Sequence, residues 1–311
     1  MGKTKQIFRR ITLILSSFVI VILVFLCVKL YLDYKNDYNN KKIEFDKYKL
    51  ELSEKTEIVN NNNIEIQNVK SKYENIDELI KNKKEEFFKK AKELENKILN
   101  GESNKRIAYL TFDDGPYLTT SDKIMDILDE KNVLATFFLL GKTKAEGIAR
   151  VYEREYNSGH TLANHTYTHK ISRTNGIYVS VSSFINDVKR QEEFLSNKFD
   201  GYKTNIVRFP GGSPTAGSLK QGIKNELYKM NYGWVDWDLE TGDGNGGDKG
   251  NSEVSYNNVI NNLKDKKIVV ISMHDYSYTT VKSLPRIIDE LKARNYVLLP
   301  LFYDSVKVNK N

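Results

Sequence analysis

Acidic and imidazole side chains occur in this sequence at spacings that suit hydrolytic metal chemistry. Asp113 and Asp114 stand together in the segment TFDDGP, directly after an apolar run, and the following Gly-Pro turns the chain away. His165 and His169 have an HxxxH spacing, which brings two imidazoles to one side of a helical turn or converges them from a loop. Two histidines and one aspartate would hold a divalent ion and leave a position open for water, which is typical of a catalytic metal site.

Two more apolar runs end in residues that could do chemistry. Arg208 ends IVR ahead of FPGG, and His274 follows IVVISM and precedes Asp275. Taken singly, two acids before Gly-Pro make an ordinary turn, and a lone arginine or histidine packs or forms an ion pair. Four such ends together favour one shared site, because catalytic residues gather at the C-terminal ends of parallel strands. His160, the remaining one of the four histidines, is expected to pack or to cap.

The elements that must position these residues follow Gly101, where short apolar runs alternate with amphipathic stretches. The apolar runs predict strands over 107–112, 134–140, 161–163, 206–209, 233–239, 268–273 and 296–301. The amphipathic stretches predict helices over 122–131, 143–157, 181–199, 219–230, 255–264 and 281–294. Such a series predicts an α/β fold, either a (β/α) barrel or a closely related parallel sheet.

The ordered segments TFDDGP, HTYTH, RFPGG, DWDLETGD and SMHD resemble the NodB-homology polysaccharide deacetylases, carbohydrate esterase family 4, over about residues 105–302. The resemblance implies a distorted (β/α) barrel of the polysaccharide deacetylase type and a metal-dependent hydrolase that releases acetate from glycans. It implies that Asp114, His165 and His169 hold the metal. Zinc is the expected ion, and cobalt or manganese would suit the same donors.

The resemblance also implies a role for each remaining motif residue. Asp113 would be the general base, held by Arg208, and His274 would be the general acid. The backbone N–H of Gly211 would help to form the oxyanion hole. An aspartate of the fourth motif would pair with the acid, and Asp243 is the expected one.

Two departures from the family pattern concern the substrate pocket. In many members Trp follows the fourth-motif aspartate, whereas here Gly244 follows Asp243 and Trp237 lies earlier. Asp236 is therefore the alternative partner for the last-motif histidine. That motif often has Leu two residues before its histidine, where this chain has Ser272. Both positions help to line the acetyl pocket in the family, so the pocket shape and the substrate stay open.

Composition divides the chain near residue 100. Gly is absent between Gly2 and Gly101, and residues 33–100 are rich in Lys, Glu and Asn. Apolar residues at helical spacing from Ile66 to Leu94 predict a helical, coiled-coil-like stalk over 32–100, through which the chain could self-associate. A solvated, partly helical spacer is the alternative. Residues 101–311 would form the catalytic domain.

The N-terminus predicts a membrane anchor. Residues 11–31 form an apolar run with Lys29 as the only charge, long enough as a helix to cross a hydrocarbon layer of about 30 Å. Basic residues within 1–10 favour a cytoplasmic N-terminus and an extracellular catalytic domain. A cleaved signal peptide is the alternative, disfavoured because no small-x-small site follows the run. Cys27 is the only cysteine, so no disulfide is expected.

Charge and composition limit the classes of molecule that the chain is expected to bind. The net charge of +7 comes from lysines spread along the chain, which disfavours nucleic-acid binding and suits an anionic wall or membrane surface. The expected substrate is the N-acetylglucosamine of peptidoglycan. The alternatives are an exported poly-N-acetylglucosamine, an O-acetylated polymer, or a catalytically silent glycan-binding scaffold. Tyr117, Tyr167 and Tyr276 adjoin motif residues and could stack on sugar rings.

Overall fold

The computed structural model describes residues 23, 25–49, 63–141, 145–245 and 250–310. Contacts divide the chain into two compact units, Met1–Asn104 and Lys105–Asn311. The division lies beside the boundary that the change in composition predicts.

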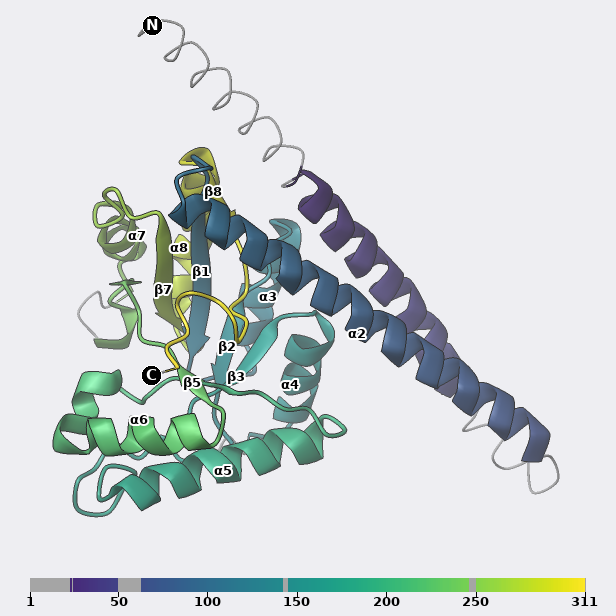
Figure 1. The fold of residues 1–311 in the computed structure, drawn as a ribbon, viewed down its shortest axis with the longest axis horizontal. Helices are drawn as coiled ribbons and strands as arrows, with labels where there is room; N and C mark the ends of the chain where they lie inside the picture. The colour runs from purple at the N-terminus through teal and green to yellow at the C-terminus, as the bar shows by residue number, and fades with distance from the viewer. Residues whose placement is uncertain (1–22, 24, 50–62, 142–144, 246–249, 311) are drawn as a thin grey trace, which may run out of the picture. The chain divides into compact units, whose positions relative to one another are not determined.

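The second unit alternates strands and helices along the chain (Figure 1). Its strands are β1 (Arg106–Asp113), β2 (Thr136–Leu139), β3 (Thr161–Asn164), β4 (Ile206–Val207), β5 (Gly233–Trp234), β6 (Leu239–Glu240), β7 (Ile268–His274) and β8 (Tyr296–Leu298). Its helices are α3 (Thr120–Glu130), α4 (Ile148–Asn157), α5 (Val181–Lys198), α6 (Lys220–Lys229), α7 (Ser252–Ile260) and α8 (Tyr278–Ala293), with 3-10 turns η1 (Ser213–Leu219) and η2 (Asp243–Asn245). Every predicted helix is present, with bounds shifted by a few residues.

The strands form one parallel sheet in the order β5-β4-β3-β2-β1-β7-β6, and β8 pairs with the start of β1. Among the described strands β5 and β6 end this order and are not hydrogen-bonded to each other. The parallel α/β fold is therefore confirmed, but the sheet is a curled half-barrel rather than a closed barrel.

Strands β1 and β7 are buried almost throughout because helices cover the sheet. Their sequences are accordingly continuous apolar runs rather than alternating ones. Phe112 on β1 and Phe137 on β2 stack with ring centroids 5.1 Å apart. Each buried aromatic side chain of this kind contributes about 1.5–3 kcal/mol to folding, so the centre of the sheet is a firm base for the residues at its edge.

The single strand predicted over residues 233–239 is wrong. It is two short strands: β5 pairs with β4 at one end of the sheet, and β6 pairs with β7 at the other. Polar residues between them account for the break, since Asp236 accepts hydrogen bonds from Ser213, and Asp238 accepts one from the N–H of Val270. The segment that contains Trp237 therefore connects the two ends of the open sheet.

The first unit contains a helix over residues 25–49 and α2 (Asn63–Leu99). Lys83 forms an ion pair with Asp37 at 3.1 Å, and the rings of Phe87 and Tyr31 lie 6.4 Å apart. As the residue number rises along α2, its contact residue on the first helix falls, so the two helices run antiparallel.

Much of the predicted N-terminal organisation lies outside the described residues. This applies to residues 11–22 and 24 of the predicted membrane span, and to the side chains of the stalk stripe from Ile66 to Ile80. Within the described part of the chain, no helix combines the length and the apolar character that crossing a membrane requires.

Candidate active site

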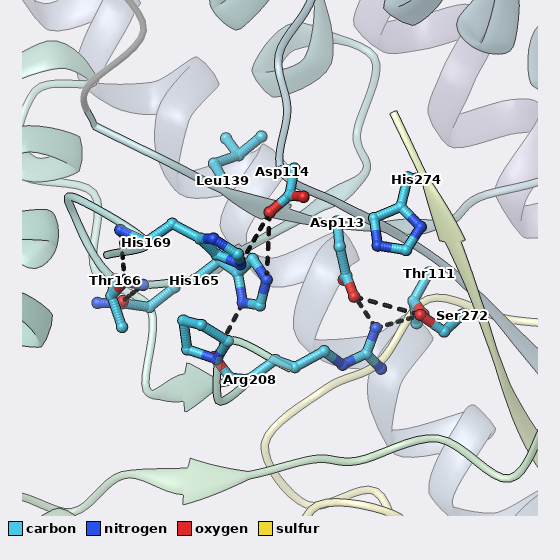
Figure 2. A network of polar contacts seen from close by, with 12 residues as sticks. Thr111, Asp113, Asp114, Leu139, His165, Thr166, His169, Arg208, Ser272 and His274 are labelled. Atoms are coloured by element: carbon cyan, nitrogen blue, oxygen red, sulfur yellow. Dashed lines mark hydrogen bonds and ion pairs between the residues drawn. The ribbon is translucent and has the colours of Figure 1, made fainter. Parts of the chain in front are cut away.

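The motif residues meet at one edge of the sheet. Asp113 ends β1, and the strand register places it beside His274 at the end of β7. His165 directly follows β3, and Arg208 directly follows β4. Because all these strands are parallel, their C-terminal ends share one edge, where Figure 2 shows the side chains pointing toward one another.

Asp114, His165 and His169 form a compact donor cluster. Oδ1 of Asp114 lies 3.1 Å from Nε2 of His169 and 3.5 Å from Nε2 of His165. One ligand atom from each residue lies within 4.8 Å of the other two. His169 has a φ of 51° and follows β3 in a loop, so the HxxxH pair converges from a loop rather than from a helical turn.

The hydrogen bonds around this cluster fit a divalent ion. Nδ1 of His165 lies 2.9 Å from the carbonyl oxygen of Arg208 and must donate to it. This bond fixes the tautomer that leaves the Nε2 lone pair facing Asp114. Oδ1 of Asp114 is buried and accepts no hydrogen bond from the described residues. A carboxylate oxygen and two imidazole nitrogens are the donors that a divalent metal takes.

Asp113 is held from both sides. Its Oδ1 accepts a hydrogen bond of 2.8 Å from Nη1 of Arg208, and its Oδ2 accepts one of 3.2 Å from Oγ of Ser272 (Figure 2). Nη1 of Arg208 also donates to Oγ1 of Thr111, and Nε donates to the carbonyl of Val235. Burial alone raises the pKa of Asp113, but Arg208 and nearby imidazoles hold it below its usual value. The carboxylate is therefore oriented and ionised.

His274 is paired with Asp243. Nδ1 of His274 lies 2.9 Å from Oδ1 of Asp243, and the backbone N–H of His274 donates to Oδ2 at 2.9 Å. The hydroxyl of Thr280 also donates to Oδ2. Burial lowers the pKa of His274, but the hydrogen bond to Asp243 and the charges of nearby carboxylates outweigh it and raise the pKa to about 9. The imidazole is therefore suited to carry a proton.

Comparison with known proteins agrees with this geometry. The family model for polysaccharide deacetylase matches residues 100–229. A peptidoglycan-N-acetylglucosamine deacetylase from Bacillus cereus is 33% identical over 219 residues, which cover 68% of this chain and 73% of the relative. The chain belongs to the polysaccharide deacetylase family. The enzymes of this family are hydrolases that act on the N-acetyl amides of glycans.

Solved structures share the fold of this deacetylase. The catalytic domain of a peptidoglycan N-acetylglucosamine deacetylase from Eubacterium rectale has a TM-score of 0.58 and 28% identity, covering 67% of this chain and 94% of that one. A polysaccharide deacetylase from Bacillus cereus has a TM-score of 0.57 and 26% identity, covering 65% and 94%.

The RFPGG turn of the deacetylase begins at Arg208 and contains Gly211. Gly211 has a φ of 73°, which favours glycine, and its carbonyl accepts a hydrogen bond from Oγ1 of Thr215 at 2.6 Å. Asp236 accepts hydrogen bonds from the N–H and Oγ of Ser213 at 2.8 and 2.6 Å. Asp236, the alternative partner for His274, therefore holds the start of η1 instead. Asp243 is the aspartate that contacts His274.

The two family departures have structural explanations in this deacetylase. A Cβ built on Gly244 would collide with the His274 ring, so the backbone packs against the imidazole and leaves no room for tryptophan. Trp237 is half-buried, and its ring lies 5.6 Å from the Arg208 guanidinium. Ser272, where many relatives have leucine, contacts Asp113 through its hydroxyl.

Three hydroxyl residues of the site were missed by sequence reasoning: Thr111, Ser272 in its contact with the base, and Thr280. Thr111 could have been found, since it lies two residues before Asp113 and so shares its face of β1. His160, expected to pack, is buried, accepts the N–H of Ala135 at Nδ1 and lies 5.1 Å from the Phe137 ring.

Proposed function

We propose that this chain is a metal-dependent deacetylase that hydrolyses N-acetyl groups of an extracellular glycan, with peptidoglycan N-acetylglucosamine as its substrate. The observation that carries the proposal is the donor cluster of Asp114, His165 and His169 beside an ionised Asp113 and a proton-carrying His274. The choice of peptidoglycan is supported by relatives whose names state that substrate. The apolar run over residues 11–31 supports a membrane anchor with the catalytic domain outside.

The three donors would hold zinc, and cobalt or manganese would suit the same set. A bound divalent ion would supply a Lewis acid that polarises the acetyl carbonyl and lowers the pKa of water. The unsatisfied Oδ1 of Asp114 and the tautomer of His165 support this assignment.

Each remaining motif residue would have one task. Asp113 would accept a proton from the attacking water, while Arg208 keeps the carboxylate ionised and oriented. The N–H of Gly211 would donate to the oxyanion that develops on the acetyl carbonyl. His274, kept protonated by Asp243, would donate a proton to the amide nitrogen, because an amine leaves poorly unless it is protonated. The products would be acetate and a free amino sugar.

Metal content and activity, measured on the same variants of the full-length protein, test this assignment. His165→Ala and His169→Ala should lose both bound metal and deacetylation of N-acetylglucosamine oligomers. Asp113→Asn should keep the metal but lose activity by about 100- to 10,000-fold, because an amide cannot accept the proton. Asp304→Asn is the matched control, since this aspartate is 70% exposed.

Two results would overturn the proposal. If both histidine variants remain fully loaded with metal, the donor set is wrong. If Asp113→Asn deacetylates as fast as the Asp304→Asn control, Asp113 is not the base. A fully loaded wild-type protein without activity on N-acetyl or O-acetyl glycans would favour the scaffold alternative.

A further inference from the structure

Two of the three tyrosines that adjoin motif residues converge beside the proposed acid. Tyr117 follows the TFDDGP motif, and Tyr276 follows His274 by two residues. Their rings meet edge to face, with centroids 5.6 Å apart and an interplanar angle of 69°. The Tyr276 ring lies 5.1 Å from the His274 imidazole, inclined by 36°. Imidazole and phenol rings thus form a continuous aromatic row.

Hydrogen bonds join the two segments that carry Tyr117 and Tyr276. The backbone N–H of Tyr117 donates to Oγ of Ser121 at 2.7 Å. That hydroxyl in turn donates to Oδ2 of Asp275, also at 2.7 Å, and Asp275 is fully buried. Because Asp275 directly precedes Tyr276, the two tyrosines keep a fixed spacing before any ligand arrives.

The third tyrosine behaves differently. The Arg190 guanidinium lies 3.8 Å above the Tyr167 ring, and Phe194 packs against it with centroids 6.0 Å apart. Tyr167 and Tyr276 are both half-buried and Tyr117 is 41% exposed, so Tyr167 differs in its neighbours: Arg190 covers its ring, whereas Tyr117 and Tyr276 meet each other. Exposure alone does not mark a site, but the Tyr117 ring is accessible and meets the Tyr276 ring beside His274.

We propose that Tyr117 and Tyr276 form an aromatic subsite for a pyranose ring of the glycan, on the His274 side of the reacting sugar. The proposal rests on the proposed function, because it takes His274 as the group that protonates the leaving nitrogen. That nitrogen must come within about 2.6–3.2 Å of the imidazole. Because Tyr276 lies only 5.1 Å from the imidazole centre, the tyrosine pair is within reach of the sugar that bears the nitrogen or of its neighbour.

The chemistry of the pair suits a sugar. Aromatic rings offer broad apolar faces to sugar C–H groups, while the phenol oxygens can bond sugar hydroxyls. Burial and the nearby charges of Asp114 and Asp243 raise the pKa of Tyr276 above its usual value. Its hydroxyl therefore stays protonated and remains a donor.

Kinetics on a long and a short substrate separate a subsite from a structural role. In the full-length, metal-loaded protein, Tyr117→Ala should raise KM for an N-acetylglucosamine tetramer by about 5- to 10-fold, the usual loss from one aromatic contact. Its kcat/KM for a small alkyl acetate, whose leaving group has no ring to stack on the pair, should change far less. Tyr276→Phe should keep most tetramer affinity and Tyr276→Leu should lose it. The control is Tyr228→Ala, because this tyrosine is 61% exposed on α6.

Equal losses on the tetramer and the alkyl acetate would overturn the subsite, since they would indicate a disturbed catalytic centre. An unchanged tetramer KM in Tyr117→Ala and Tyr276→Leu would overturn it as well. A binding measurement separates this proposal from the proposed function: saturation-transfer NMR of the tetramer on metal-free protein should show binding that Tyr117→Ala weakens. Such binding, in a protein whose metal-loaded form deacetylates no glycan, would refute the enzyme and keep the subsite.

Discussion

Asp113 and His274 end neighbouring strands, and their pKa values are shifted in opposite directions. Arg208 keeps the pKa of Asp113 low against the effect of burial, and Asp243 raises the pKa of His274 against the same effect. Two titratable groups whose environments push their pKa values apart are the mark of an acid and a base working as a pair. The buried Arg208 and Asp243 are therefore positioning residues.

The Asp243–His274 pair predicts a pH effect. His274 has a raised pKa, so its protonated form persists up to about pH 9 and is lost above it. Asp243→Asn keeps the size of the side chain but removes the charge, so the pKa of His274 should fall. The alkaline limb of the kcat/KM profile should move to lower pH by at least about one unit. Profiles of wild type and variant at equal metal loading provide the check, and coincident alkaline limbs would contradict the pairing.

Some residues of the site could be predicted from the sequence, and others could not. His165, His169 and His274 stand out because the chain has only four histidines, and Asp114 stands out because the acidic pair directly follows an apolar run. The roles of Ser272 and Thr280 could not be read in advance, because serine and threonine are ordinary strand and helix residues. Only the register that sets β7 beside β1, and the start of α8 beside η2, brings their hydroxyls to the carboxylates.

At the scale of elements, a buried pair of acids joins α4 to the end of β7. Glu155 and Asp275 are both fully buried, and their carboxyl groups lie close enough to interact electrostatically. Neither oxygen of Glu155 has a hydrogen-bond partner among the described residues. Burial and the neighbouring Asp275 raise the pKa of Glu155 well above its usual value, so Glu155 holds a proton. This contact braces the strand that carries His274.

The raised pKa of Glu155 makes folding stability depend on pH. An acid whose pKa is raised in the folded state loses stability as pH rises from its unfolded to its folded pKa. Glu155→Gln keeps a donor toward Asp275 but cannot ionise. Relative to wild type, its Tm should be nearly unchanged at pH 5 and higher at pH 8 by on the order of 3 °C for one pKa unit.

Thermal scans at the two pH values check this, with the exposed Glu153→Gln of the same helix as the control. A Tm difference that is the same at both pH values would mean that Glu155 does not carry the proton.

Strand and helix positions follow from the sequence because apolar runs and amphipathic stretches depend on local burial alone. The break between β5 and β6 does not, because it depends on where Asp236 and Asp238 find donors in distant segments. The open sheet could not be predicted for a similar reason. Strands β4, β5 and β6 are only two residues long, so their sequences do not determine which strands they pair with.

At the scale of the whole molecule, the antiparallel first unit alters the expected stalk. A single unbroken helix over 33–100 would reach about 100 Å at 1.5 Å per residue, but α2 returns alongside the first helix. In this arrangement the charged residues Lys90 and Glu93 of α2 lie near Cys27, which is part of the predicted membrane span. Because charges are costly in hydrocarbon, insertion of residues 11–31 into a membrane would require this hairpin to open, which would lengthen the reach.

The last prediction concerns the substrate in the cell. If the opened unit carries the deacetylase to wall glycan, muropeptides from cells lacking this protein should contain fewer glucosamine units than those from wild-type cells, as mass spectrometry would measure. Wild-type protein and the Asp304→Asn control should restore the glucosamine, whereas Asp113→Asn should not, because it lacks the base. Restoration by Asp113→Asn would favour a scaffold. Unchanged muropeptides, together with activity of the purified protein on soluble N-acetylglucosamine oligomers, would instead assign it to an exported polysaccharide.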